Sequence, residues 1–382
     1  MNRPTASNNT LHDATALLGA IHQLPLKKRT RIMNVCGGHE RSITMAGLRS
    51  VLPDKLELIP GPGCPVCVCP EEDVFEAIQL ALHEDIILVA FGDMLRVPVN
   101  VPKREARTLE QAKALGADIR PVGSPIDVVH IAQQNPDKRV VFFAAGFETT
   151  TAPVAAMLEQ GVPENLSVLL SGRLTWPAVA MLLDTGAAAF DALIAPGHVA
   201  TVMGPEEWQF VVDKHQLPCA IAGFTTNSLL AAIYSTLKQL VDDNLYLDNC
   251  YSQVVKPGGN VTAKKHMTNA LTVTDANWRG VGIIEKSGYA LQDKHAVHDA
   301  RTTFPSYAGD ARKRAGEMPP GCDCASVVLG KIYPNQCRLF GAACTPRNPI
   351  GPCMVSDEGA CRIWWSAGMR TADNKRVASY AD

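Results

Sequence analysis

The sequence predicts an α/β protein with two similar parallel-sheet domains, followed by an irregular C-terminal domain rich in cysteine. Short apolar runs alternate with helix-length segments from about residue 30 to residue 240. Related glycine-containing turns follow several of these runs in both halves of that region. Beyond about residue 245 the periodicity is replaced by a segment dense in Pro, Gly and Cys. Continuous apolar strands separated by helical segments are typical of parallel sheets covered on both faces.

The expected strands are short and almost continuously apolar. They are Arg31–Val35, Lys55–Ile59, Ile86–Ala90, Val140–Ala144, Ser167–Leu170, Ala192–Ala195 and Cys219–Ala222. Helices are expected over Arg41–Leu52 and Glu71–His83, each directly after a cysteine motif.

A weak internal repeat suggests where the domains divide. Turns of the type Cys-Gly-Gly-His-Glu, Pro-Gly-Pro-Gly and Phe-Gly-Asp in the first half have counterparts in the second, although glycine turns after strands are common enough for chance. Prolines concentrate between residues 120 and 140. We therefore expect an N-terminal extension at 1–29, α/β domains at 30–130 and 131–245, and a cluster domain at 246–382.

Composition excludes several classes of protein. The 382 residues are 46% hydrophobic and 19% charged, with a formal net charge of −2, so no basic field favours nucleic acid. The longest apolar run, residues 86–91, is too short to cross a membrane, and the first residues lack a signal-peptide core. We expect a cytoplasmic protein whose twelve cysteines, apart from Cys219 and Cys250, serve metal binding or redox chemistry rather than a disulfide framework.

The first sulfur site is expected near the N-terminus. Cys36-Gly-Gly-His39-Glu40 follows an apolar strand, and glycines at a strand's carboxyl end allow the tight turn where α/β sheets place ligands. Cys36 and His39 could share a metal there. Cys64-Pro-Val-Cys67 has the spacing of a redox dithiol, and the expected helix after it would lower a thiol pKa.

The second sulfur site is expected near the C-terminus. Cys322, Cys337, Cys344 and Cys361 are separated by 14, 6 and 16 residues, and four thiolates complete a [4Fe–4S] cluster. Cys324 and Cys353 lie in the same segment, so spacing alone leaves open which four of six bind, and a zinc site is the alternative.

Two turns in the second half are weaker candidates. In Gly146-Phe-Glu148-Thr149-Thr150, hydroxyls and helix N-terminal amides could hold a small anion, or the turn could simply cap a helix. Pro196-Gly-His198 could face a ligand or be a loop histidine.

Together these motifs resemble the HypD family of hydrogenase maturation factors. The resemblance rests on the Cys36, Cys64, Gly146 and Pro196 motifs and on Asn348–Cys361, and it runs from about residue 30 to 365. The family's cluster pattern of four cysteines matches Cys322, Cys337, Cys344 and Cys361, which implies that these bind the [4Fe–4S] cluster and that Cys324 and Cys353 do not.

The resemblance also implies a function. A HypD-type protein is a scaffold on which the Fe(CN)2CO group of [NiFe]-hydrogenase is assembled before its transfer to the large subunit. Iron would sit near Cys36 with His39 close by, in a metal site that also includes Cys64 and Cys67. The Cys64–Cys67 thiol pair would also pass electrons to the iron from the cluster. The implied partners are a HypC-type small chaperone, which adds a cysteine ligand, and a HypE-type donor, which delivers cyanide from a thiocyanate.

The second half departs from the family pattern at Gly223-Phe-Thr-Thr-Asn227, where the family usually has Gly-Phe-Glu-Pro. An iron-sulfur thiol-disulfide oxidoreductase acting on a soluble partner is the alternative function. No Gly-x-Gly-x-x-Gly turn follows an expected strand, which weakens a nicotinamide- or flavin-dependent enzyme.

Overall fold

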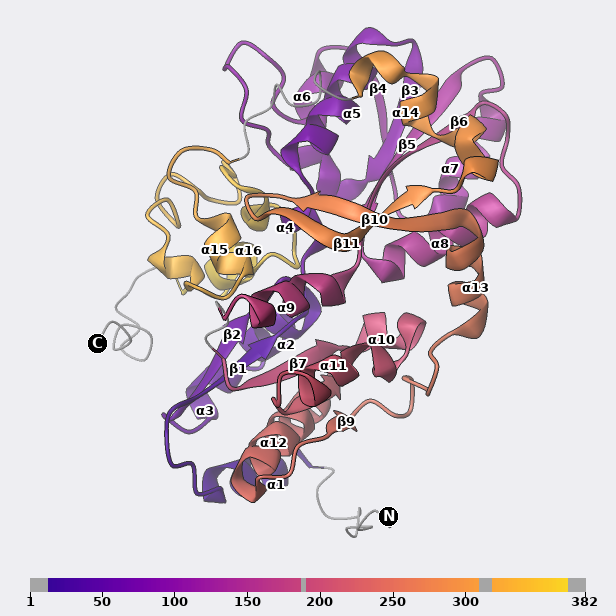
Figure 1. Cartoon of the computed structure of the whole chain (residues 1–382). Helices are drawn as coiled ribbons and strands as arrows, with labels where there is room; N and C mark the ends of the chain where they lie inside the picture. The colour runs from indigo at the N-terminus through magenta and orange to yellow at the C-terminus, as the bar shows by residue number, and fades with distance from the viewer. Residues whose placement is uncertain (1–12, 187–189, 309–317, 370–382) are drawn as a thin grey trace.

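The computed structural model describes residues 13–186, 190–308 and 318–369, and its two sheets confirm the predicted α/β class. Within these ranges, sheet A has five strands in the order β2-β1-β7-β8-β9, all parallel. Sheet B has six strands in the order β10-β11-β6-β5-β3-β4, of which β10 and β11 form an antiparallel hairpin at one edge. The C-terminal segment, yellow in Figure 1, lies beside the junction of the two halves.

The strand bounds are as follows. Sheet A contains β1 (Thr30–Asn34), β2 (Leu56–Pro60), β7 (Ala192–Pro196), β8 (Cys219–Ala222) and β9 (Leu247–Asn249). Sheet B contains β3 (Ile86–Phe91), β4 (Asp118–Val122), β5 (Arg139–Gly146), β6 (Leu166–Arg173), β10 (Leu271–Trp278) and β11 (Gly282–Leu291).

Every expected apolar run overlaps a strand, but the polar strands were not expected from the sequence. The hairpin β10–β11 mixes buried and exposed residues, and β4, the edge strand at the other side of sheet B, is also partly exposed. Strands that are partly exposed to solvent lack the continuous apolar run of a parallel strand covered on both faces.

The two sheets do not follow the expected division at residue 130. Sheet A takes its strands from residues 30–60 and 192–249, and sheet B from residues 86–173 and 271–291. The chain crosses from one sheet to the other and back, so β4 and β5, on either side of residue 130, belong to the same sheet. A local repeat cannot show such a crossing, because a parallel strand pairs with any strand that the crossover reaches.

Helices cover both faces of sheet A because its strands bury alternate residues on opposite faces. Ile32 and Ile194 pack on one face against α1, α2, α3 and α12. Met33 and Leu193 pack on the other face in a core that includes α9, α11 and Trp208. The helices around this sheet are α1 (Ala14–Gln23), α2 (Gly37–Met45), α3 (Leu48–Val51), α9 (Thr175–Asp184), α10 (Gly197–Met203), η2 (Pro205–Trp208), α11 (Gln209–Asp213) and α12 (Thr226–Asp242).

The expected helix Arg41–Leu52 is divided in two. Helix α2 begins earlier, at Gly37, and ends at Met45, and α3 begins at Leu48. The break lies at Gly47, whose φ of 62° is left-handed and therefore cannot continue a right-handed helix. The second expected helix, Glu71–His83, is confirmed as α5.

Sheet B is covered in the same way. Val140 and Phe142 pack with α7, α8 and α13 on one face, while Val141 and Phe143 join a core with α5 and α6 on the other. The elements around this sheet are η1 (Gly92–Arg96), α5 (Glu71–His83), α6 (Leu109–Ala114), α7 (Pro125–Gln134), α8 (Glu148–Glu159), α13 (Val261–Ala270), η3 (Asp293–His298), α14 (Ala300–Thr303) and η4 (Pro305–Tyr307).

One core joins the two sheets to the cysteine-rich segment. It contains inner-face residues of both sheets, α4 (Pro65–Val68) and most of the C-terminal cysteines. The C-terminal segment supplies α15 (Cys324–Val328), η6 (Pro334–Gln336), η7 (Pro352–Met354) and α16 (Ala360–Ser366). Its short helices are therefore held by the rest of the protein rather than by a core of their own.

In the part of the chain that the structure describes, no helix has both the length and the apolar character needed to span a membrane.

Candidate functional site: two groups of cysteines

Parallel pairing brings the two N-terminal cysteine motifs together. Strands β1 and β2 are parallel neighbours in sheet A, so Cys36 after β1 and Cys64 after β2 lie at the same edge. The backbone N–H of Gly37 donates to the carbonyl of Gly63 at 3.0 Å. A Cβ at Gly63 would lie 2.4 Å from the Cα and backbone nitrogen of Cys36, so only glycine allows this approach.

Cys64 and Cys67 form a disulfide across the first turn of α4, with their Cα atoms 5.3 Å apart. Both residues are buried, and the backbone N–H of Cys67 also donates to the Cys64 sulfur at 3.2 Å. The predicted pair is thus close enough for dithiol-disulfide exchange.

A small cavity connects this disulfide to Cys36 and to the C-terminal segment. Its volume is about 10 Å³, and its lining includes Cys36, Cys64, Cys67, Cys353 and Glu358. A space of this size holds about one water molecule or a single ion. Three sequence regions that are far apart therefore meet at one point.

Cys36 is partly exposed, and its thiol is held in the protonated form. Burial of the sulfur raises the pKa of Cys36 to about 12, against the backbone N–H groups of His39 and Gly38, which favour the thiolate. The nearby charge of Glu358 adds to the increase. A metal ion would have to displace this proton in order to bind the sulfur.

His39 is fully buried beside the cavity but does not line it. Its Nε2 lies 3.0 Å from the carbonyl of Ala222, which can only accept, so Nε2 carries the hydrogen. Burial lowers the pKa of His39 to about 4, and the ring is therefore neutral. Its Nδ1 has no partner among the described residues and offers the lone pair that a metal ligand needs.

Glu40 lines the cavity and joins it to the last helix. Its carboxylate accepts hydrogen bonds from Asn34 at 3.1 Å, Arg49 at 2.8 Å and Trp364 at 2.7 Å. Burial alone would raise the pKa of Glu40, but Arg49 and these hydrogen bonds outweigh it and lower the pKa. The residue is ionised and holds α2 against α16.

Glu358 was not predicted as a site residue, although it lies in the Asp-Glu-Gly-Ala-Cys361 sequence of the second cysteine group. Its backbone is so close to α2 that a Cβ at Gly37 would lie 2.4 Å from its carbonyl oxygen. Burial and the charge of Asp93 raise the pKa of Glu358. The cysteine before it, Cys353, lines the same cavity and was also outside the predicted set.

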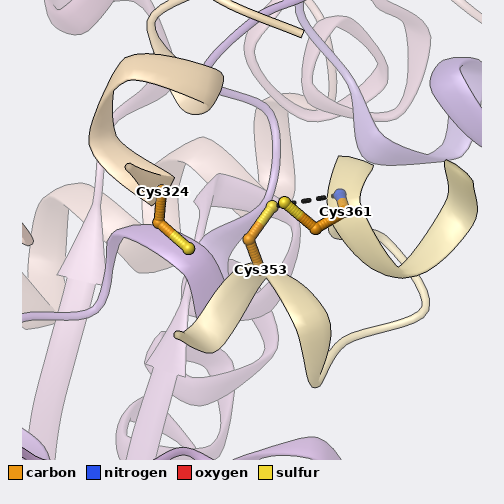
Figure 2. Close-up of side chains that lie close together, drawn as sticks. All are labelled: Cys324, Cys353 and Cys361. Atoms are coloured by element: carbon orange, nitrogen blue, oxygen red, sulfur yellow. Dashed lines mark hydrogen bonds between the residues drawn. The ribbon is translucent and has the colours of Figure 1, made fainter. Parts of the chain in front are cut away.

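The C-terminal segment gathers its cysteines into a second group, and Figure 2 shows three of them facing one another. The sulfurs of Cys324, Cys353 and Cys361 all lie within 4.8 Å of one another, and all three residues are buried. The backbone N–H of Cys361 donates to the Cys353 sulfur at 3.4 Å. Hydrogen bonds from Cys324 and Cys361 place the pKa of Cys353 well below its usual range.

The other predicted cluster cysteines lie around this trio. Cys322 is next to Cys324, since a Cβ at Gly351 would lie 2.5 Å from both sulfurs. Burial raises the pKa of Cys344 to about 11, with smaller contributions from the charges of Cys324 and Cys322. Burial likewise raises the pKa of Cys337, and the charge of Cys322 acts in the same direction. Of the predicted four, only Cys361 belongs to the closest trio.

The charge beside this group suits a negatively charged cluster. Arg279 is fully buried, and its Nη2 donates to Glu71 and to the carbonyl of Pro98. Its Nε and Nη1 have no hydrogen-bond partner within the described ranges. The hydrogen bond to Cys324 and burial raise the pKa of Cys322, and the charge of Arg279 opposes this increase. Soft thiolates next to unused guanidinium donors fit an iron-sulfur cluster, whose four thiolate ligands leave it anionic.

The candidates from the second half lie outside the cavity lining. Glu148 begins α8 and is buried, where its carboxylate accepts from the N–H and hydroxyl of Thr175 at 2.6 and 2.7 Å. Burial raises the pKa of Glu148 to about 7 despite these hydrogen bonds. Thr149 is exposed and Thr150 is half-buried.

His198 is exposed, and its ring stacks on Phe224 with their centroids 3.9 Å apart. The Phe224 ring also contacts the His39 ring, at a centroid distance of 5.0 Å. Phe224 therefore contacts both histidines and connects the Pro-Gly-His198 turn to the Cys36 motif.

Comparison with known proteins identifies the family. The family model described as "HypD: Hydrogenase formation hypA family" matches residues 12–368. The chain belongs to the HypD family. It is 38% identical to hydrogenase maturation factor HypD2 of Bradyrhizobium diazoefficiens, over 92% of this chain and 93% of that protein. It is also 38% identical to HypD of Rhodobacter capsulatus, over 90% of this chain and 90% of that protein. The identity to HypD of Escherichia coli is likewise 38%, over 88% of each chain.

The match includes every cysteine motif of this HypD chain, from Cys36 to Cys361. The resemblance inferred from these motifs is therefore confirmed, and with it the assignment to the hydrogenase maturation factors.

Gly63→Ala tests the close approach of the two N-terminal motifs. Its new Cβ would overlap the Cys36 backbone, so we expect the free energy of unfolding to fall by about 1–3 kcal/mol. Gly123→Ala is the matched control, because nothing lies within 4 Å of its Cβ, and it should change stability by less than about 0.5 kcal/mol. Urea unfolding measures both, and equal effects would contradict the geometry.

Glu148→Gln tests the buried carboxylate. The pKa of Glu148 is about 7 in the folded state and 4.5 ordinarily. The stability that the protonated carboxyl contributes is therefore fully present below pH 4.5 and is lost as the pH rises through 7. From about pH 4.5 to pH 8, wild type should lose up to about 3 kcal/mol relative to Glu148→Gln.

Glu159→Gln on the same helix is the control with opposite sign. A hydrogen bond from Lys294 lowers the pKa of Glu159 to about 2, so its stabilisation is present above pH 4.5 and is lost at lower pH. Glu159→Gln should therefore be less stable than wild type near neutral pH. Urea unfolding of the three proteins across this pH range checks both signs, and parallel curves would refute the assignment.

Proposed function

We propose that this HypD-family protein is a scaffold on which the Fe(CN)2CO group of [NiFe]-hydrogenase is assembled. One observation carries the proposal: the same small cavity is lined by Cys36, by the Cys64–Cys67 disulfide and by Cys353 of the cysteine-rich segment. A metal anchor, a two-electron carrier and a candidate cluster segment therefore adjoin one another.

Cys36 is the proposed anchor for the iron, which is cargo rather than a resident cofactor. Binding releases the thiol proton, and Glu358 is the carboxylate in the lining that we assign to receive it. His39 is the proposed second ligand on account of its unpartnered Nδ1. Glu40 does not bind iron in this scheme, since its carboxylate is committed to Asn34, Arg49 and Trp364.

The cysteine pair accounts for the electrons that cyanide delivery requires. Cleaving the S–C bond of a thiocyanate consumes two electrons and one proton, and it yields a thiol and a cyanide ion. Oxidation of the Cys64 and Cys67 thiols to the disulfide supplies two electrons and releases two protons. Reduction of the disulfide by two electrons from an external one-electron donor, together with two protons from solvent, restores the thiols.

Cys322, Cys337, Cys344 and Cys361 are the proposed ligands of a resident [4Fe–4S] cluster. Such a cluster supplies electrons one at a time when bound. The protein's own contribution is to bury these thiols in the core shared with α4, and to place the Arg279 guanidinium beside them.

The proposed partners follow from the same scheme. A HypC-type chaperone would add a cysteine to the iron, a HypE-type protein would present the thiocyanate, and the hydrogenase large subunit would receive the finished group. These steps would take place in the cytoplasm, where free thiols persist.

The alternative is a thiol-disulfide oxidoreductase that acts on a soluble partner. Such an enzyme must expose one sulfur to its substrate, but Cys64 and Cys67 are only 5% and 2% exposed. Burial favours electron transfer to a centre held at Cys36, which lines the same cavity, over direct exchange with a soluble disulfide.

Infrared spectroscopy of anaerobically purified protein with its small partner tests the scaffold. Wild type should show cyanide and CO stretching bands and one iron beyond those of the cluster. Cys36→Ala should lose these bands and hydrogenase maturation but keep the visible absorption of the cluster. Cys250→Ala, which removes a partly buried thiol outside the cavity lining, should retain both. Cyanide and CO bands that remain in Cys36→Ala would overturn the scaffold function. A wild-type protein that contains the cluster but shows none of these bands would favour the oxidoreductase function.

Single alanine variants of the six C-terminal cysteines test the ligand set. Cys322→Ala, Cys337→Ala, Cys344→Ala and Cys361→Ala should lose cluster iron and sulfide and destabilise the C-terminal segment. Cys324→Ala and Cys353→Ala should keep the cluster. Loss of iron in these two with retention in Cys337→Ala would instead assign the ligands to the close trio, and zinc without sulfide would exclude a cluster.

A further inference from the structure

A second pocket lies along β1 and β2 and is bounded by the loop at 330–336. It has a volume of about 270 Å³, and its lining includes Arg31 of β1 and both Glu57 and Ile59 of β2. This pocket is separate from the small cysteine-lined cavity. No residue lines both.

The polar lining of this pocket is mainly cationic. Arg29, Arg31 and Lys331 contribute positive charge, and Glu57 is the single acidic residue in the lining. The Glu57 carboxylate lies 3.2 Å from the Nε of Arg31, and it also accepts a hydrogen bond from the Tyr333 hydroxyl. Its charge is therefore already balanced by a neighbour within the wall.

The lining also offers hydrogen-bond donors of the kind that anions need. Lys331 is exposed and forms no ion pair with the described residues. The Gln336 side-chain oxygen accepts from the backbone N–H of Tyr333, which leaves its amide nitrogen as a donor. Arginine and lysine are the residues that most often recognise phosphate oxygens. The guanidinium group of arginine donates two parallel hydrogen bonds, and the ammonium group of lysine acts as a point charge.

We propose that this pocket binds a small phosphate-bearing molecule. Its volume is near the lower end of the range of about 300–1,000 Å³ typical of small-molecule sites, which suits a free phosphate or the phosphate end of a nucleotide. The proposal does not depend on the function of the cysteine site.

Binding should be detectable as stabilisation of the C-terminal segment. The pocket joins sheet A to that segment, and its wall residue Tyr333 stacks on Trp364 of α16 with their centroids 5.2 Å apart. A ligand that contacts both sides binds the folded state alone, and therefore raises the thermal midpoint.

Isothermal titration calorimetry and thermal unfolding of the full chain at low ionic strength test the proposal. Inorganic phosphate and ADP are the probes, and succinate is a dicarboxylate of comparable charge. Saturable binding of phosphate or ADP is expected, and the probe with the higher affinity identifies the ligand as free phosphate or a nucleotide. Succinate that binds with an affinity equal to those of phosphate and ADP would overturn the proposal that the ligand carries a phosphate. The absence of saturable binding of both phosphate and ADP would overturn the site.

The double variant Arg29→Gln, Lys331→Gln tests the location. It removes two cationic side chains from the rim of the pocket, so affinity for the better probe should fall by about tenfold or more. The matched control Lys27→Gln, Lys103→Gln removes the same charge from two exposed lysines outside the lining, and should change affinity by less than about twofold. Equal losses in the two variants would show general charge attraction and overturn the site, and unchanged thermal midpoints without ligand establish that both variants fold.

Discussion

The buried carboxylate of Glu40 is the interaction on which the arrangement of the cysteine sites depends. It accepts from Arg49 and Asn34 within sheet A and its helices, and from the indole of Trp364 on α16. Arg49 also lies over the Trp364 ring, 5.3 Å from its centroid. A buried, ionised carboxylate needs all of these partners, because each unmet hydrogen bond costs more than a met one contributes. The position of α16, and hence of Cys361, is thereby tied to the helix that follows Cys36.

Parallel pairing supplies the other half of the geometry. It places the ends of β1 and β2 side by side, so two short glycine turns are enough to bring a thiol and a disulfide together. This close approach requires residues without a side chain at two positions. A Cβ at Gly63 would overlap the backbone of Cys36, and a Cβ at Gly37 would overlap Glu358. Residues that carry no chemistry therefore decide whether the reactive sulfurs meet.

The sequence predicts the strands and the cysteine motifs better than it predicts which of these motifs lie close together in the folded protein. Central strands and α5 follow from continuous apolar runs and helical period, and Cys36, Cys64 and Cys67 follow from their turns. Cys353 and Glu358 could not be assigned to the cavity, because only the packing of α16 on α2 brings residues more than 300 positions away to Cys36. The crossing of the chain between sheets was also hidden, since a strand's own residues do not specify which parallel neighbour it pairs with.

The size of the cavity constrains how a scaffold of this kind could work. About 10 Å³ accommodates one ion, whereas iron with three diatomic ligands needs several times that space. The disulfide side is closed by buried residues, but Cys36 is partly exposed. Under the proposed function, the ligands would therefore have to grow from Cys36 outward, away from the disulfide. A partner that covers Cys36 from solvent and adds its own thiolate would complete the site from the open side, which is the role proposed for the small chaperone.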